Sequence, residues 1–147
     1  MIDLTKHFDQ VKVNRQNDQD LIWCIAREKW LILTPEEMVR QTVVLHLIDM
    51  GYSVKHITAE RQIVYNQMRK RYDVAVSDKQ GNIHILVECK EPGTRLSDDT
   101  LRQASVYNLA LGGKYLWITN GHDHRLYQID HELKSVIPIE RLPLVGN

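Results

Sequence analysis

Two neighbouring segments in the middle of the chain alternate between apolar and other side chains. In residues 72–77 the apolar side chains stand at even positions, and in residues 83–90 most of them stand at odd positions. Successive side chains of a strand point to opposite faces, so each segment is predicted to form a β-strand with one apolar face. Turn-forming residues separate the two segments. The pattern therefore predicts a β-hairpin whose loop is formed by residues 79–82.

The register of this hairpin decides which polar side chains meet. The apolar sets of the two strands must share a face, because a slip of one residue would turn a whole strand over. Asp73 then lies directly opposite Glu88, and Lys90 lies on the same face one step further along. Tyr72 and Cys89 are expected on the opposite, apolar face. The sequence thus predicts a cluster of two carboxylates and one ammonium at the open end of the hairpin.

The rest of the pattern predicts a single domain of the α/β (α+β) class. Residues 1–33 read as a polar arm followed by a hairpin at 21–33, both packed on a core formed by residues 34–147. The expected core elements are a helix at 34–50, a strand at 57–65, the hairpin, a helix at 97–112, and strands at 115–119 and 125–129. This order, α-β-β-β-α-β, predicts a mixed central sheet flanked by helices, with an N-terminal β extension.

The first helix has a clear start signal. Thr34 is the expected N-cap, and Pro35 occupies the first helical position. Glu37 completes a capping box, and this role would account for the glutamate without a place at the metal site. Gly51 ends the helix. The side chains expected to face the core are Met38, Val44, Leu45, Leu47 and Ile48.

Composition narrows the class of protein. The chain has 147 residues and no net charge. The lack of a basic excess makes tight non-specific binding to DNA less favourable. Positive charge is nevertheless concentrated in Arg69, Lys70 and Arg71, just before Asp73. No run is long and apolar enough for a membrane span or a signal peptide, and two cysteines in strand-like runs are expected as buried free thiols. We therefore expect a cytoplasmic protein.

The carboxylate pair indicates a specific chemistry. Two carboxylates a few ångströms apart repel each other unless a hard cation lies between them. Mg²⁺ binds one or two carboxylates and completes its coordination with waters and substrate phosphate. A nearby lysine can orient an attacking water or stabilise charge on the phosphate. A salt-bridged trio on a solvated sheet face would give the same pattern, and the residues alone leave the two readings about equally supported.

The pattern of these charged residues resembles a known nuclease motif. Asp73 followed by Glu88-Cys89-Lys90 resembles the D…ExK motif of the PD-(D/E)xK nuclease superfamily. The wider sequence is similar to the N-terminal nuclease domain of type I restriction enzyme R (HsdR) subunits, from about Ile22 to Tyr127. The matching segments are residues 34–41, 71–73, 87–92, 103–108 and 118–121. Tyr72 stands where the superfamily motif usually has proline.

This resemblance implies a restriction-endonuclease-like fold and a DNA endonuclease that uses Mg²⁺ or Mn²⁺. Asp73, Glu88 and the Cys89 carbonyl would hold the metal, and Lys90 would assist the water. Gln103 and Tyr107, one helical turn apart, would border the site. The expected partners are DNA and other restriction-modification or motor subunits. The chain has no Gly-x-x-x-x-Gly-Lys-[Ser/Thr] loop, so it is not expected to translocate DNA by itself.

Three alternatives stay open at this point. Glu60 is expected on the Asp73 face of the preceding strand, where it would be either a further metal ligand or a partner for Arg71. Arg69, Lys70 and Arg71 would either contact the DNA backbone or form an ordinary solvated turn. The whole domain would be either a nuclease or a non-catalytic nucleic-acid-binding module that retains the fold.

Overall fold

The computed structural model describes residues 2–65, 68–99, 101 and 112–145, with the backbone alone for residues 61–65 and 68–71. Its elements are η1 (Thr5–Gln10), β1 (Val13–Gln16), β2 (Gln19–Cys24), β3 (Lys29–Ile32), α1 (Pro35–Asp49), η2 (Val54–His56), β4 (Ile57–Tyr65), β5 (Met68–Ser77), β6 (Ile83–Cys89), β7 (Tyr115–Thr119), β8 (His124–Asp130) and β9 (Ser135–Pro138). The order of the described core elements agrees with the prediction, and β4 has the predicted bounds. The helix predicted at residues 97–112 lies mostly outside the described residues.

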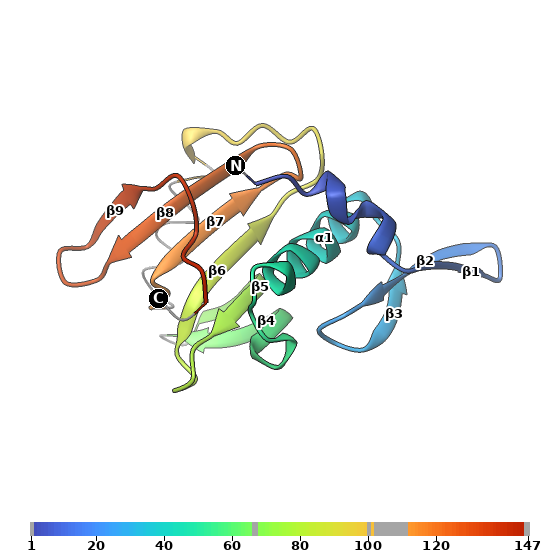
Figure 1. Cartoon of the computed structure of the whole chain (residues 1–147), viewed down its shortest axis with the longest axis horizontal. Helices are drawn as coiled ribbons and strands as arrows, with labels where there is room; N and C mark the ends of the chain where they lie inside the picture. Colours follow the sequence, from blue (N-terminus) through green and yellow to red (C-terminus); the bar gives the residue numbers. More distant parts are fainter. Residues whose placement is uncertain (1, 66–67, 100, 102–111, 146–147) are drawn as a thin grey trace.

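Two sheets organise the described part of the chain. The main sheet has the order β4-β5-β6-β7-β8-β9, and β6 and β7 are its parallel pair among otherwise antiparallel neighbours. β1, β2 and β3 form a smaller antiparallel sheet, called here the N-terminal sheet, which projects from one side of the molecule (Figure 1). A mixed sheet arises because the chain crosses over between β6 and β7, as parallel pairing requires.

Helix α1 lies across one face of the main sheet (Figure 1). Val43, Val44 and Leu47 of α1 are fully buried in one cluster with Val74, Ile85, Val87 and Trp117 of the strands. Of the five side chains predicted to face the core, Val44 and Leu47 are buried, whereas Ile48 is exposed and Met38 and Leu45 are half-buried. The prediction was partly wrong because η1 and β2 also contact α1. These contacts bury polar side chains of the helix, such as His46 against His7 of η1.

A second apolar cluster covers the opposite face of the main sheet. It contains Tyr72, Ala75, Leu86, Leu116, Ile118 and Ile129, with Leu96 and Leu101 packed against it. Tyr72 was expected on the Val74 face, and this expectation is wrong. Glu60 on the neighbouring strand has a φ of 49°, outside the strand region, and the alternation of β5 breaks at the same level. Tyr72 instead turns to the Ala75 side, where its hydroxyl bonds Thr58 Oγ1 at 2.7 Å.

The N-terminal segment is more ordered than the sequence suggested. The hairpin predicted at residues 21–33 is confirmed as β2 and β3, but the expected polar arm contains η1 and β1. Buried His7 of η1 fixes this arm to α1, because its Nε2 lies 3.3 Å from His46 Nδ1. β9 was also not predicted.

A glycine at the β7–β8 turn provides a test of the packing between this turn and α1. Gly121 has a φ of 96°, and a Cβ at this position would lie 3.2 Å from Cγ2 of Val39 on α1. Gly81 has a comparable φ of 85° with nothing within 4 Å of a Cβ. We predict that Gly121→Ala lowers the free energy of unfolding by about 2–3 kcal/mol and Gly81→Ala by about 1–2 kcal/mol. Urea denaturation measures both, and equal losses would show that the contact with α1 is unimportant.

Candidate active site

The register of the β5–β6 hairpin brings the two predicted carboxylates together. Val74 pairs with Val87 and Val76 with Ile85, which confirms the predicted register for these pairs, and Asp73 and Glu88 are the next residues on the two strands, just beyond the last pair of the ladder. The register shifts between Val76 and Ser77, so that Ser77 pairs with Ile83. The loop therefore comprises residues 78–82, and the prediction of a loop at 79–82 was wrong. Both carboxylates are mostly buried, with 19% and 17% of their side-chain surface exposed.

Asp73 is held by two donors from different elements. Its Oδ2 accepts the Cys89 backbone N–H at 2.7 Å, and its Oδ1 accepts Nη2 of Arg40 at 3.1 Å. The carboxylate therefore takes the place of a ladder hydrogen bond at the end of the hairpin. The Cys89 side chain is buried in the cluster beneath α1, as predicted, and burial raises the pKa of its thiol well above the usual value. Because the thiol is neutral and buried beneath α1, the backbone carbonyl is the group of Cys89 that a metal would bind.

Lys90 follows directly after β6. Its Nζ lies 3.9 Å from Oε2 of Glu88, and its side chain is more exposed than either carboxylate. Its backbone N–H donates to the Thr119 carbonyl at 2.8 Å, which extends the pairing between β6 and β7 by one bond. The adjoining turn is fixed by Asn120, whose Oδ1 accepts the backbone N–H groups of His122 and Asp123. The parallel strand pair thus positions Lys90 beside Glu88.

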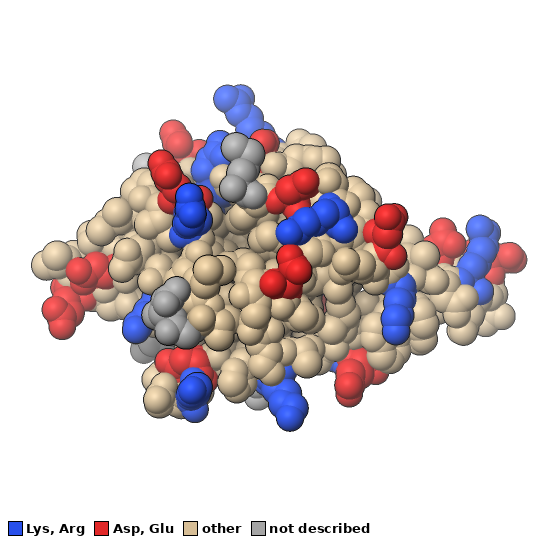
Figure 2. Space-filling model, viewed as in Figure 1, with Lys and Arg blue, Asp and Glu red and all other residues tan. Residues whose placement is uncertain are grey.

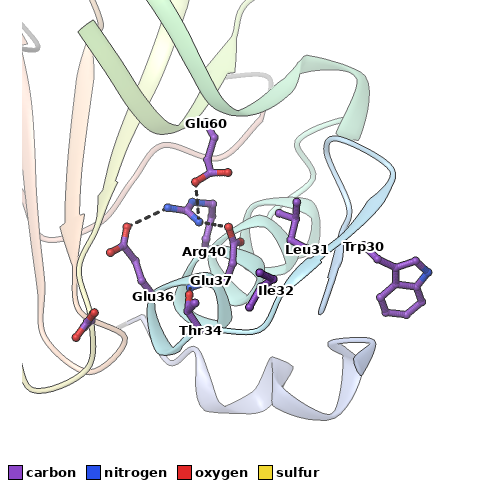
Figure 3. Close-up of a pocket in the computed structure, with 9 residues that line it drawn as sticks. Trp30, Leu31, Ile32, Thr34, Glu36, Glu37, Arg40 and Glu60 are labelled. Carbon is purple, nitrogen blue, oxygen red and sulfur yellow. Dashed lines mark hydrogen bonds and ion pairs between the residues drawn. The ribbon is translucent and has the colours of Figure 1, made fainter. Parts of the chain in front are cut away.

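Arg40, which the sequence pattern does not single out, occupies the centre of the site. Its guanidinium is almost fully buried and contacts four carboxylates. Figure 3 shows three of them, Glu36 at 3.0 Å, Glu37 at short range and Glu60 at 3.3 Å. The fourth is Asp73, at 3.1 Å. Burial lowers the pKa of Arg40, but Glu37 and Asp73 outweigh burial and raise the pKa above its usual value. The position of Arg40 one turn after Glu36 and Glu37 was a possible signal in the sequence.

Glu37 and Glu60 have different partners from those expected. The Thr34 Oγ1 accepts the Glu37 backbone N–H at 3.0 Å, so the N-cap is confirmed. The Glu37 carboxylate, however, contacts Arg40 and Gln41, so the capping box does not explain it. Its pKa is raised by burial. Glu60, expected to pair with Arg71 or a metal, binds Arg27 at 2.9 Å as well as Arg40.

Several predicted site residues cannot be placed. Gln103 and Tyr107 lie outside the described residues, as do the side chains of Arg69, Lys70 and Arg71. Their roles therefore stay predictions.

Among the side chains that the structure describes, the cluster carries more negative than positive charge. Five carboxylates, those of Glu36, Glu37, Glu60, Asp73 and Glu88, face Arg40, Lys90 and Arg27. Burial, followed by the charge of Asp73, raises the pKa of Glu88 to about 7. A buried carboxylate with such a pKa gains from a nearby cation.

The donor set fits a hard divalent cation. Asp73 and Glu88 offer carboxylate oxygens from adjacent strands, and Mg²⁺ needs one or two such groups, with waters filling its other positions. In the described part of the chain, no group of three or more His, Cys, Asp or Glu side chains is arranged to hold a metal. An ion held by Asp73 and Glu88 would therefore keep water among its ligands.

A cleft of about 570 Å³ adjoins the site. Trp30, Leu31 and Ile32 of β3 line one side, and Thr34, Glu36, Glu37, Arg40, Glu60 and Glu91 line the rest (Figure 3). Arg40 belongs both to this wall and to the contact with Asp73. The cleft therefore connects the N-terminal sheet with the carboxylate cluster.

Charges elsewhere are mixed. On the face shown in Figure 2, acidic and basic side chains of the described residues alternate and do not gather into one basic patch. Among the described residues, no helix is long and apolar enough to cross a membrane.

Residues 35–143 match the family described as type I restriction enzyme R protein N terminus (HSDR_N). The chain belongs to this family. The match spans more than half of the chain and includes α1, the β5–β6 hairpin and the β7–β8 turn. The resemblance found in the sequence is therefore confirmed, and the R protein N-terminal domain is a nuclease-related domain with the restriction-endonuclease-like fold.

Solved structures agree on the fold. The domain is similar to a fragment assigned to an HsdR subunit of a type I restriction enzyme from Vibrio vulnificus YJ016, with 21% identity, a TM-score of 0.53, and coverage of 76% of this chain and 24% of that one. This chain thus spans about a quarter of that relative, and at this identity the likeness shows the fold alone.

Two looser matches are to restriction enzymes and nucleases as well. The type IIG restriction endonuclease BpuSI has 24% identity and a TM-score of 0.47 over 76% of this chain and 13% of that one. A protein assigned as a nuclease of DUF820 from Anabaena variabilis ATCC 29413 has 10% identity and a TM-score of 0.46 over 87% and 80%. Comparison with curated proteins finds no significant match.

The raised pKa of Glu88 predicts a pH-dependent stability of the metal-free protein. Unfolded Glu88 ionises near 4.5 and folded Glu88 near 7, so the folded state retains the proton over this interval. The stabilisation is full below pH 4.5 and is lost as the pH rises toward 7. We expect a loss on the order of 1–3 kcal/mol that is absent in Glu88→Gln.

Thermal unfolding in EDTA across this pH range measures the effect. Glu91→Gln, at an exposed glutamate nearby, is the matched control and should behave as wild type. Identical pH profiles for wild type and Glu88→Gln would contradict the assignment.

Proposed function

We propose that this domain is a metal-dependent DNA nuclease that hydrolyses phosphodiester bonds. The observation that supports it most strongly is the juxtaposition of Asp73 and Glu88 at the open end of the hairpin, with Lys90 beside them. Carboxylates from adjacent strands and a neighbouring lysine form a complete set for phosphoryl hydrolysis. Membership in the restriction enzyme R family supports DNA as the substrate.

Asp73, Glu88 and the Cys89 carbonyl are the groups proposed to hold Mg²⁺ or Mn²⁺. When bound, such an ion activates water and offsets charge on the phosphate. Asp73 contributes a preset carboxylate, because the Cys89 N–H and Arg40 already fix its orientation. Glu88 contributes a carboxylate that loses its proton when a cation approaches, since its raised pKa arises from burial and from Asp73.

Lys90 has the geometry of a group that acts on the water and the phosphate. Its ammonium lies 3.9 Å from Glu88, and its side chain is the more exposed of the two, at 37% against 17%. In the proposed reaction a water oxygen bonds to phosphorus and gives up a proton to solvent, one P–O ester bond breaks, and the leaving oxygen takes up a proton from solvent. Lys90 donates a hydrogen bond to the phosphoryl oxygen on which charge builds up. Its backbone bond to Thr119 keeps this side chain in place.

Other residues complete the proposal. Gln103 and Tyr107 would position the site or the DNA strand, and Arg69, Lys70 and Arg71 would contact the DNA backbone. Because this chain spans only part of the relatives it matches, motor and specificity functions would belong to other domains or subunits.

Divalent ions should stabilise the folded protein. A ligand that binds only the native state raises its stability, by about 2.7 kcal/mol at a hundredfold excess over Kd. We predict that Mg²⁺ or Mn²⁺ raises the Tm of the wild type and of Glu132→Gln, an exposed control. The rise should vanish in Asp73→Ala and Glu88→Ala. Differential scanning fluorimetry with a metal titration tests this, and an equal rise in all four proteins would exclude the site.

Cleavage should depend on Lys90 more than binding does. We predict that Lys90→Ala lowers the rate of plasmid nicking with Mn²⁺ by about 100-fold or more, since the lost interaction acts in the transition state. Metal-induced stabilisation and DNA affinity should stay close to wild type. Gln103→Ala and Tyr107→Phe should reduce the rate less.

The same assay distinguishes the nuclease from a binding module. It uses plasmid and single-stranded DNA with Mg²⁺, Mn²⁺ or EDTA. A wild type that binds DNA without nicking it, alone and with motor and specificity subunits added, would favour the non-catalytic module.

A further inference from the structure

The cleft beside the site follows the outer edge of β3. In the described part of the chain the N-terminal sheet has the order β1-β2-β3, so β3 is an edge strand. Three consecutive residues, Trp30, Leu31 and Ile32, line the cleft. A cleft over one face of a strand would contact alternate residues, because successive side chains point to opposite faces. The consecutive lining therefore places the cleft along the strand edge.

The ladder between β2 and β3 directs backbone groups of β3 toward that edge. The Leu33 N–H donates to the Asp20 carbonyl at 3.0 Å, directly after the last strand residue. Hydrogen-bonded pairs alternate along an antiparallel ladder, so Leu31 is the next bonded position on β3. The N–H and C=O groups of Trp30 and Ile32 then point away from β2. An edge of this kind is a template for pairing with another extended chain.

Apolar side chains flank the same edge. Trp30 and Ile32 share a face of the N-terminal sheet and are 39% and 57% exposed. Trp30 stands opposite Trp23, and the two rings pack edge to face with their centroids 5.3 Å apart. A strand added to β3 would cover this face, because cross-strand neighbours contact each other. Its side chains on that face would therefore be apolar.

The rest of the cleft wall is acidic. Its charged side chains are four glutamates and one arginine, namely Glu36, Glu37, Glu60, Glu91 and Arg40 (Figure 3 labels all but Glu91). Glu36 and Glu91 are the accessible ones, since the Glu36 side chain is 39% exposed and Glu91 is exposed. Basic side chains complement such a wall, whereas it repels the phosphates of a nucleic acid.

We propose that the edge of β3 and this cleft form the docking site for an extended segment of a partner protein, in which apolar and basic side chains alternate. The segment adds to β3 as a further strand. Main-chain hydrogen bonds to Trp30 and Ile32 supply affinity, and alternate side chains supply specificity. Those on one face contact Trp30 and Ile32, and those on the other face pair with Glu36 and Glu91. The inference goes beyond the proposed function, because docking requires no catalysis.

The probe is a fluorescein-labelled heptapeptide of alternating valine and lysine, and fluorescence anisotropy in EDTA measures its binding. We expect saturable binding to the wild type that weakens about tenfold or more when glutamate replaces lysine in the peptide. Trp30→Ala and Glu91→Lys should each weaken it by about fivefold or more. Val13→Ala and Glu132→Lys, exposed residues that do not line the cleft, are the matched controls and should bind as wild type.

Strand addition has its own signature in amide hydrogen exchange. Saturating peptide should slow exchange of the Trp30 and Ile32 N–H groups by about tenfold or more, while the Leu31 N–H, which points to β2, changes little. Nuclear magnetic resonance resolves the individual amides. A peptide with alternate backbone nitrogens methylated lacks half of its donors and should give less protection.

Each other outcome overturns the inference. No binding at about 1 mM peptide, or equal binding by wild type, Trp30→Ala and Glu91→Lys, would exclude the docking site. Binding without protection of Trp30 and Ile32 would exclude strand addition. A single-stranded oligonucleotide of about 12 nucleotides that binds more tightly than the peptide, and is lost in Trp30→Ala, would make the cleft a nucleic-acid site. All measurements are made in EDTA, so they are independent of nuclease activity.

Discussion

The buried guanidinium of Arg40 is the contact on which the site depends. It joins α1 to β4 and β5, and through Glu60 and Arg27 it reaches the N-terminal sheet. Removing one partner of a buried ion pair costs far more than the net value of the pair, because the other charge stays buried. Helix, sheets and carboxylates are therefore held in one mutual arrangement, and the orientation of Asp73 follows from it.

The strands supply the second constraint. Both faces of the main sheet are packed with apolar side chains, so the β5–β6 hairpin cannot slip without exposing core residues. Asp73 strengthens the end of the hairpin by accepting the Cys89 N–H. A hairpin locked in this way keeps two like charges close together, and their repulsion, added to burial, raises the pKa of Glu88. The packing of the sheet thus offsets the repulsion between the two carboxylates.

Family membership and geometry point in the same direction. The family match covers the helix, the hairpin and the β7–β8 turn, which are the parts that position Arg40, Asp73, Glu88 and Lys90. The chain is a fraction of the length of its relatives. In the proposed function, a domain with no net charge would act on DNA that other parts of a larger assembly hold.

The sequence by itself determined the hairpin register, the start and end of α1, and the meeting of Asp73, Glu88 and Lys90. These features depend on the period of two along a strand and on local capping, which neighbouring residues fix. Only the tertiary structure decided that Arg40 enters the site. Which helical side chain reaches a distant strand depends on how α1 rotates as it packs against β2, η1 and the main sheet, and no local period encodes that rotation.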